Sequence, residues 1–256
     1  SAELEQEIKQ HNEDCDNSLC ENFVTNQKQD AHIINAIGGI GNGEYEDVSN
    51  SAEVEQKAEQ ENKDCSNATC ENSIGDPADE ESGQIQHVEI TNTIGDSGNY
   101  KDVSNSAELE QTADQENDNC DDSSDCTNDI FVQSQVADIS NTIGGSASGS
   151  SYYGGDLSNS AELEQVSTQE NDDCNGSGCF NDIIVQAQAA DIANDIGGSG
   201  SYEDVSNSAE VEQDVKQKNE DCKDAPFCEN VVLNQEQSAV ISNAIGGSGS
   251  YEDVSN

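Results

Sequence analysis

Apolar and amide residues alternate with charged residues along most of this chain. From Val48 to Asp64 the even-numbered positions carry only Val, Ala, Gln, Asn and Asp, whereas the odd-numbered positions are Ser, Glu and Lys. A period of two residues over such a length indicates a long β-strand with one interior and one charged face. An acidic helix is the alternative, because Glu, Gln, Ala and Leu favour helices. The apolar residues do not follow the three- and four-residue spacing of a helix, so we favour a strand.

A second alternating run follows a pair of cysteines in each segment of about 50 residues. It is clearest after Cys179, where Ile184, Gln186, Gln188, Ala190, Ile192, Asn194 and Ile196 occupy every second position and a Gly pair ends the run. Each segment is therefore expected to contain an arm, a Cys turn, a second arm and a Gly/Ser-rich turn. Folding the arms together predicts an interior that is apolar near the Gly turn and amide-rich near the cysteines.

This segment recurs five times, which predicts a repeat architecture. The repeats span residues 1–50, 51–105, 106–159, 160–207 and 208–256. We expect an all-β fold with a single repeat domain over 1–256, a β-solenoid of five stacked coils with two long arms each. Two short rungs per repeat are the other arrangement. The second repeat departs from the others at Ile74–Gly83, where Pro77 predicts a bulged loop.

Stacking equivalent repeats would allow buried amides to pair with one another. At the strand spacing of about 4.8 Å, each Gln or Asn can hydrogen-bond to its copies above and below. The expected first-arm rows are Gln6, Gln56, Gln111, Gln165 and Gln213; Gln10, Gln60, Gln115, Gln169 and Gln217; and Asn12, Asn62, Asn117, Asn171 and Asn219. Asn35, Asn92, Asn141, Asn194 and Asn243 form a further row in the second arm.

The ten cysteines fall in five close pairs, which predicts disulfides and an oxidising compartment. The pairs are Cys15–Cys20, Cys65–Cys70, Cys120–Cys126, Cys174–Cys179 and Cys222–Cys228. A chain that starts at Ser1 and lacks Met is also expected to be trimmed from a secreted precursor, at the cell surface or outside the cell. Two sequons, at Asn67 and Asn175, lie inside these Cys loops and are possible glycosylation sites.

The charge is strongly acidic, with 8 Lys plus Arg against 55 Asp plus Glu and a net charge of −47. Such a surface repels nucleic acid and anionic membranes and attracts cations. No stretch approaches the roughly 20 apolar residues of a membrane span. Because only 31% of the residues are hydrophobic, a disordered polyelectrolyte is an alternative to the solenoid.

The spacing Q-x-A-x-Q-x-N, at Gln56–Asn62 and Gln111–Asn117, resembles the Gln/Asn ladder repeats of curli-type functional amyloids. This resemblance implies a secreted β-solenoid subunit that polymerises into fibres. The acidic repeats with paired cysteines also resemble surface and sheath proteins of some archaea. The string GGSGSYED is similar to the calcium-binding repeat of RTX proteins, with Tyr202 or Tyr251 in place of a liganding Asp; a Gly/Ser turn is the alternative interpretation.

These features predict a structural subunit that polymerises with itself, head to tail, into an extracellular filament or sheath. The first and last repeats both carry the full motif, so stacking is expected to continue between chains through Ser1, Ala2, Leu4, Val254 and Asn256. The alternative is a monomeric, calcium-responsive acidic adhesin or binding module. His11 and His32 are expected in solvent, and no catalytic constellation repeats, so we expect no enzyme, no metal ligand and no cofactor beyond counterion cations.

Overall fold

The described part of the chain is built from strands and turns. The computed structural model describes residues 1–37, 43–45, 47–79, 82–95, 98–100, 102–121, 125–144, 155–197, 201–246 and 250–256. These residues form fifteen strands, and no helix among them has the length and apolar character needed to cross a membrane. The prediction of an all-β fold is therefore confirmed.

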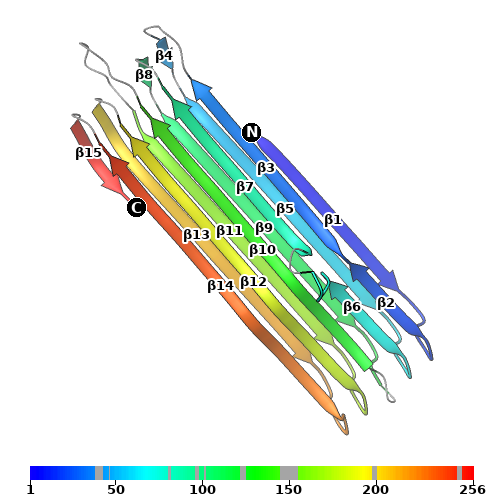
Figure 1. Ribbon diagram of the computed structural model, residues 1–256. Helices are drawn as coiled ribbons and strands as arrows, with labels where there is room; N and C mark the ends of the chain where they lie inside the picture. Colours follow the sequence, from blue (N-terminus) through cyan, green and yellow to red (C-terminus); the bar gives the residue numbers. More distant parts are fainter. Residues whose placement is uncertain are drawn as a thin grey trace.

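Two parallel sheets face each other and enclose the core (Figure 1). The first sheet, called the A sheet here, contains β1 (Ala2–Asn12), β5 (Val48–Asn62), β9 (Val103–Asn117), β11 (Leu157–Asn171), β13 (Ser201–Asn219) and β15 (Ser250–Ser255). The second, the B sheet, contains β2 (Leu19–Val24), β3 (Asn26–Ile37), β6 (Thr69–Ile74), β7 (Gly83–Ile94), β10 (Asp125–Ile143), β12 (Gly178–Ile196) and β14 (Phe227–Ile245). The short strands β4 (Gly43–Tyr45) and β8 (Gly98–Tyr100) pair with each other.

Equivalent residues of successive repeats lie side by side in both sheets. In the A sheet Gln56 pairs with Gln111, and Gln111 pairs with Gln165. In the B sheet Cys126 pairs with Cys179 in the same parallel register. A slip of one residue would turn the glutamates of each arm into the core, so the alternation itself holds this register.

The core is layered along the strands, which corrects one expectation. The end near the Gly/Ser segments is apolar, as predicted, but it also contains the buried amides of Asn50, Asn92 and Asn105. The cysteine half also holds an apolar layer, which includes Ala58, Ala113, Ile74, Ile130 and Ile183. Apolar and amide layers therefore alternate, because each arm places both kinds of residue on its interior face.

A change of side-chain orientation in the B sheet explains why the Ile layer was missed. Ile183 is fully buried, whereas Ile184 and Val185 both lie on the outer side before Gln186 returns to the interior. The assignment of Ile184 to the interior is therefore wrong. The same two-residue step separates Ile130 from Gln133, and neighbouring strands keep their register across it. One strand thus contains two alternating runs, and its interior residues change from odd-numbered to even-numbered positions, or the reverse, between them.

The insertion of the second repeat lies at this same step. β6 ends at Ile74 and β7 begins at Gly83, while β10 runs uninterrupted beside both strands. Gly83 has a φ of +129°, and a Cβ there would lie 2.2 Å from the carbonyl oxygen of Val132. Only glycine fits this position. The expected loop is therefore confirmed at both of its ends, while residues 80–81 lie outside the described part.

Candidate functional site: amide ladders that end at two open sheet edges

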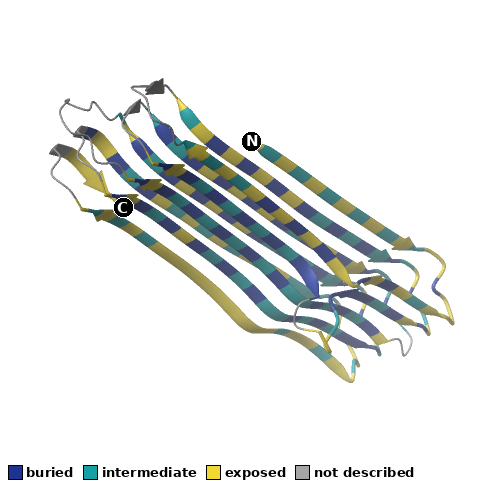
Figure 2. Cartoon of the chain, turned by 45° about the horizontal axis from the view of Figure 1, so that its top comes forward, coloured by how far each residue is buried: buried dark blue, intermediate teal, exposed yellow. Residues whose placement is uncertain are grey.

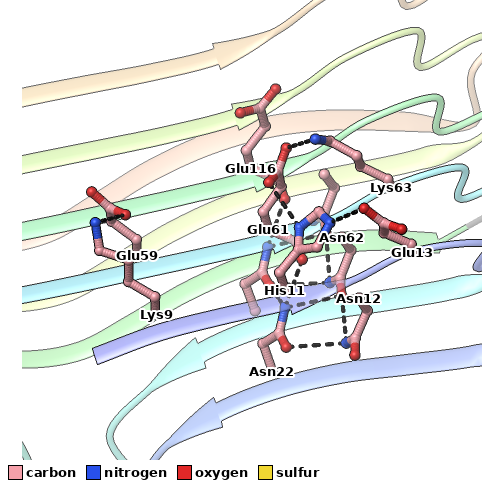
Figure 3. Close-up of polar contacts among 12 residues, drawn as sticks. Lys9, His11, Asn12, Glu13, Asn22, Glu59, Glu61, Asn62, Lys63 and Glu116 are labelled. Carbon is pink, nitrogen blue, oxygen red and sulfur yellow. Dashed lines mark hydrogen bonds and ion pairs between the residues drawn. The ribbon is translucent and has the colours of Figure 1, made fainter. Parts of the chain in front are cut away.

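A double row of asparagines crosses the interior next to the cysteines, and Figure 3 shows its first members, Asn12, Asn22 and Asn62. Asn12 Nδ2 donates to Asn62 Oδ1 at 2.8 Å along the A sheet and to Asn22 Oδ1 at 3.0 Å across to the B sheet. Asn62 repeats both bonds, to Asn117 at 2.9 Å and to Asn72 at 3.0 Å. The two rows therefore form one zigzag network that ties both sheets and all five repeats together. A second network of this kind includes Asn50, Asn92 and Asn105.

Four rows of glutamine also stack through the interior. Gln111 Nε2 donates to Gln56 Oε1 at 3.1 Å, and Gln165 Nε2 donates to Gln111 Oε1 at 3.0 Å. The Gln60 row continues in the same way, and two further rows pass through Gln84 and Gln86 in the B sheet. Gln111 and Gln115 are completely buried, so these bonds satisfy amide groups that water cannot reach. The first rung of the Gln6 row differs, because Gln56 donates to backbone carbonyls and the buried Gln6 Oε1 has no partner.

The two kinds of ladder run in opposite directions. Among the described residues, every Gln–Gln bond is donated towards the N-terminal repeat, as from Gln237 to Gln188 and from Gln188 to Gln135. Every Asn–Asn bond between neighbouring repeats is donated towards the C-terminal repeat, as from Asn128 to Asn181 and from Asn181 to Asn230. The stack of repeats consequently has a chemical polarity.

Bonds across the interior fix this polarity. Gln111 Nε2 also donates to the carbonyl oxygen of Ser134 at 2.9 Å, and Asn117 Nδ2 donates to the carbonyl oxygen of Thr127 at 3.2 Å. Turning either amide over would set its own oxygen against that carbonyl oxygen. Since a buried, unpaired acceptor costs about 1–3 kcal/mol, the observed orientation is the one that the facing sheet selects.

Most ladder residues of the first and last repeats are less buried than their inner copies: Gln6, Gln10 and Asn12 are partly buried, although Gln27 is completely buried. Gln213, Gln217 and Asn219 are only partly buried, and Gln235 and Gln237 are exposed. In Figure 2 the outermost strand on the C-terminal side, β14, is coloured as exposed along most of its length. Interior side chains thus reach the surface at both edges, where the C-terminal edge offers Gln acceptors and the N-terminal edge offers Gln donors.

The residues expected at a contact between chains lie at these two edges. Ala2 and Leu4 belong to β1, whose only neighbour in the A sheet is β5, and Ser1 is exposed beside them. Val254 lies in β15, the last strand of the same sheet, and is 47% exposed. Asn256 extends the asparagine network, because its Oδ1 accepts a bond from Asn243 Nδ2 at 2.7 Å.

All five cysteine pairs form disulfides, and each one closes the turn between two arms. The first arm of the second repeat ends at Asn62 rather than continuing to Asp64, which has a φ of +56°. Asp and Asn tolerate this left-handed conformation better than most residues. The bonded sulfurs stack into a buried column beside the asparagine network. Closing a loop this small stabilises the fold by about 2 kcal/mol per disulfide in the chain-entropy treatment.

We expect the disulfides to be reduced in an order set by their burial. The three inner pairs, which begin at Cys65, Cys120 and Cys174, are completely buried, whereas Cys222 of the last pair is exposed. A water-soluble phosphine should therefore open Cys222–Cys228 first and the inner pairs only after unfolding. Timed alkylation and mass spectrometry would measure the order, and simultaneous reduction of all five pairs would contradict it.

The outer faces carry rows of like charge. Glu53 pairs in register with Glu3 and Glu108, and Glu55 pairs with Glu5 and Glu110. Burial, reinforced first by Glu110 and then by Glu5, raises the pKa of Glu55. The few lysines interrupt such rows: Lys9 Nζ lies 3.0 Å from Glu59 Oε2, and hydrogen bonds from Lys57 and Lys9 lower the pKa of Glu59.

The remaining predicted positions lie on the surface or outside the described part. Asn67 and Asn175 are both exposed in Cys turns, so glycosylation there stays a prediction. Of the two calcium-like strings, residues 198–200 and 247–249 lie outside the described part, and Tyr202 is buried in an apolar cluster. His11 lies between two carboxylates, at 2.8 Å from Glu61 and 2.9 Å from Glu13.

Sequence reasoning missed two features of the site. The direction of the ladders depends on carbonyl groups of the facing sheet, which alternation along one strand does not reveal. The row of Asn22, Asn72, Asn128, Asn181 and Asn230 also went unrecognised, although these residues follow each second cysteine by two positions. That constant spacing was a signal in the sequence.

Comparison with known proteins adds no relative: no family model, no curated protein and no solved structure matches this chain.

Proposed function

We propose that this protein is an extracellular structural subunit whose copies stack head to tail into a filament or sheath for surface attachment or protection. The proposal treats the chain as a five-coil β-solenoid, with one strand or strand pair of each sheet in every coil. The observation that carries it is the opposite, one-way direction of the Gln and Asn ladders, which makes the two edges complementary.

A second copy is the occupant that fits the C-terminal edge. This edge offers the Oε1 atoms of Gln235 and Gln237, the last members of their rows. The A-sheet rows end in the partly buried Gln213 and Gln217, and the N-terminal edge of another copy brings to them the Nε2 groups of the partly buried Gln6 and Gln10. The first members of the B-sheet rows, Gln27 and Gln29, are buried and donate one hydrogen each to the carbonyl oxygens of Lys57 and Glu55. The asparagine rows match in the opposite sense, with donors at the C-terminal edge and acceptors at the N-terminal edge.

The same chemistry disfavours symmetrical dimers. Two N-terminal edges would bring Gln donors against Gln donors, and two C-terminal edges would bring acceptors against acceptors. Each mismatched buried pair costs about 1–3 kcal/mol per unpaired group. A head-to-tail contact leaves the same edges open on the product, so growth continues without closing into a ring.

Charge opposes this growth, because stacking would place Glu3 of one copy over Glu210 of the next. Screening the repulsion with salt should therefore promote assembly, since the Debye length falls to about 3 Å at 1 M. Five disulfides are typical of extracellular proteins, and they support assembly outside the cell.

Electron microscopy and sedimentation of the oxidised protein at low and high salt would test the proposal. We expect unbranched filaments with a 4.7–4.8 Å cross-β reflection, and more polymer at high salt. The substitution Gln237→Lys places a charge on the interior side of the exposed last strand, where solvent reaches it in the monomer but not in a filament. It should raise the concentration needed for assembly by about 100-fold, because an unpaired buried charge costs several kcal/mol.

Ser238→Lys is the matched control, since it adds the same charge to the outward face of the same strand. This variant should assemble nearly as the wild type does. Monomers at every concentration and salt level, or equal inhibition by both substitutions, would refute the proposal. Binding of calcium by the monomer would instead favour the adhesin.

A further inference from the structure

We propose that His32, His87 and Asp30 form a binding site for one divalent transition-metal ion, such as zinc or copper, on the outer face of the B sheet. The three ligand atoms that these residues offer lie within 4.8 Å of one another. The site does not depend on polymerisation, because all three residues belong to the first two repeats of one chain.

Strand register creates the cluster. β3 and β7 pair so that Asp30 lies beside His87, and His32 lies beside Glu89. The two histidines therefore occupy diagonal corners of a square whose other corners are carboxylates, and their ring centres are 5.6 Å apart. No other repeat has a histidine at either position: the equivalents are Val136, Ala189 and Ser238 in one row and Asp138, Asp191 and Val240 in the other.

The distances fit a small ion after a modest side-chain rotation. Zinc binds His nitrogen and carboxylate oxygen at about 2.0–2.2 Å, which places tetrahedral ligand atoms about 3.4 Å apart. Asp30 Oδ1 and His87 Nδ1 are already 3.1 Å apart. The His32 ring is 52% exposed and can turn towards them. Three protein ligands leave the fourth position for water.

Carboxylates outside the three ligands would hold the rings in place. Glu89 Oε2 lies 2.9 Å from His32 Nδ1, so Nε2 is the atom that His32 would offer to the ion. Asp138 Oδ2 lies 3.5 Å from His87 Nε2, on the side opposite Asp30. Metal-binding histidines commonly use their second ring nitrogen in this way. Lys28, whose Nζ is 3.8 Å from Asp30 Oδ2, is the one nearby cation that the described residues show, and His87 contacts the other oxygen, Oδ1.

The donor set selects the class of ion. Imidazole nitrogens favour zinc, copper and nickel, whereas calcium and magnesium prefer oxygen ligands alone. The many surface carboxylates would take up the latter ions without distinction. The two imidazoles should therefore allow this site to hold a transition metal in an excess of magnesium.

Calorimetric titration of the oxidised protein with zinc chloride, in excess magnesium chloride, would test the site. We expect one ion per chain, with affinity about 100-fold or more lower in His32→Ala and His87→Ala. Glu89→Gln should weaken binding by about 10–100-fold, as expected for a residue that orients a ligand. His11→Ala is the matched control, because His11 contacts carboxylates only, and it should bind zinc as the wild type does.

Copper adds a readout of ligand identity. The electron paramagnetic resonance spectrum of the one-ion complex should show coupling to two imidazole nitrogens, and each single His variant should lose one of them. Because the ion would link β3 to β7, zinc should also raise the melting temperature of the wild type but not of the His32→Ala/His87→Ala double variant. Wild-type zinc binding by that double variant, or a copper spectrum without nitrogen coupling, would overturn the proposal.

Discussion

Replacing Asn117 by alanine is expected to lower the free energy of unfolding by about 3–5 kcal/mol. Asn117 Nδ2 donates to Asn128 and Asn171, and its Oδ1 accepts bonds from Asn62 and Asn72 at 2.9 and 3.1 Å. The side chain is completely buried, so alanine would leave several amide groups without a partner and without water. Each such group costs about 1–3 kcal/mol. Urea unfolding with the disulfides intact would measure the loss.

The equivalent substitution at the edge should cost far less. Asn230 accepts bonds from Asn181 and Asn219 but is exposed, so water can replace the lost partner. Asn230→Ala is therefore expected to lower stability by about 1 kcal/mol or less in the monomer. Equal losses for the two variants would mean that the ladders do not hold the interior together. In the proposed filament Asn230 becomes an inner residue, and its substitution should then weaken assembly.

Alternation in the sequence predicts the fold where the interior residues of a strand stay at every second position along its whole length. Those of β5 and β9 do so from the first to the last residue, and both the register and the buried amides of Gln56 and Gln111 follow from it. The prediction fails in the B sheet, where two outward residues in succession reverse the parity beside Val132. The pattern of one strand does not predict this step, because β10, β12 and β14 make it together and regain their common register on its far side.

The candidate site was predictable in its residues but not in its geometry. The rows of Gln and Asn are readable because their spacing recurs in every repeat. Their direction, by contrast, is set by carbonyl groups such as that of Ser134, which lie in the facing sheet. The cluster of His32 and His87 likewise arises from a diagonal contact between repeats, and these residues lie 55 positions apart in the sequence.

Stability is expected to fall as pH rises from about 4 to about 7, and Asp129 should account for much of the fall. Burial, reinforced by Asp182 and then Glu71, raises the pKa of Asp129 from its ordinary 3.8 to about 7. The folded state therefore binds this proton more tightly than the unfolded state, so ionisation above the ordinary value opposes folding. The full penalty is present above about pH 7. A shift of this size corresponds to about 4 kcal/mol, which partial exposure to solvent reduces to about 2 kcal/mol.

Asp129→Asn should therefore stabilise the protein by about 2 kcal/mol at pH 8 and have little effect at pH 4. Thermal or urea unfolding across this range would measure the difference, with Asp191→Asn, an exposed position on the same sheet, as the control. Burial also raises the pKa of Glu116 and Asp118, so the stability of the Asp129→Asn variant should still fall as pH rises, but less steeply than that of the wild type. Salt should reduce the contribution of neighbouring charges but not that of burial, because screening acts on charge pairs and not on lost hydration. Two results would contradict this account: 1 M salt abolishes the fall of stability with pH in the wild type, or Asp129→Asn leaves that fall unchanged. Either would show that surface repulsion alone governs the pH response.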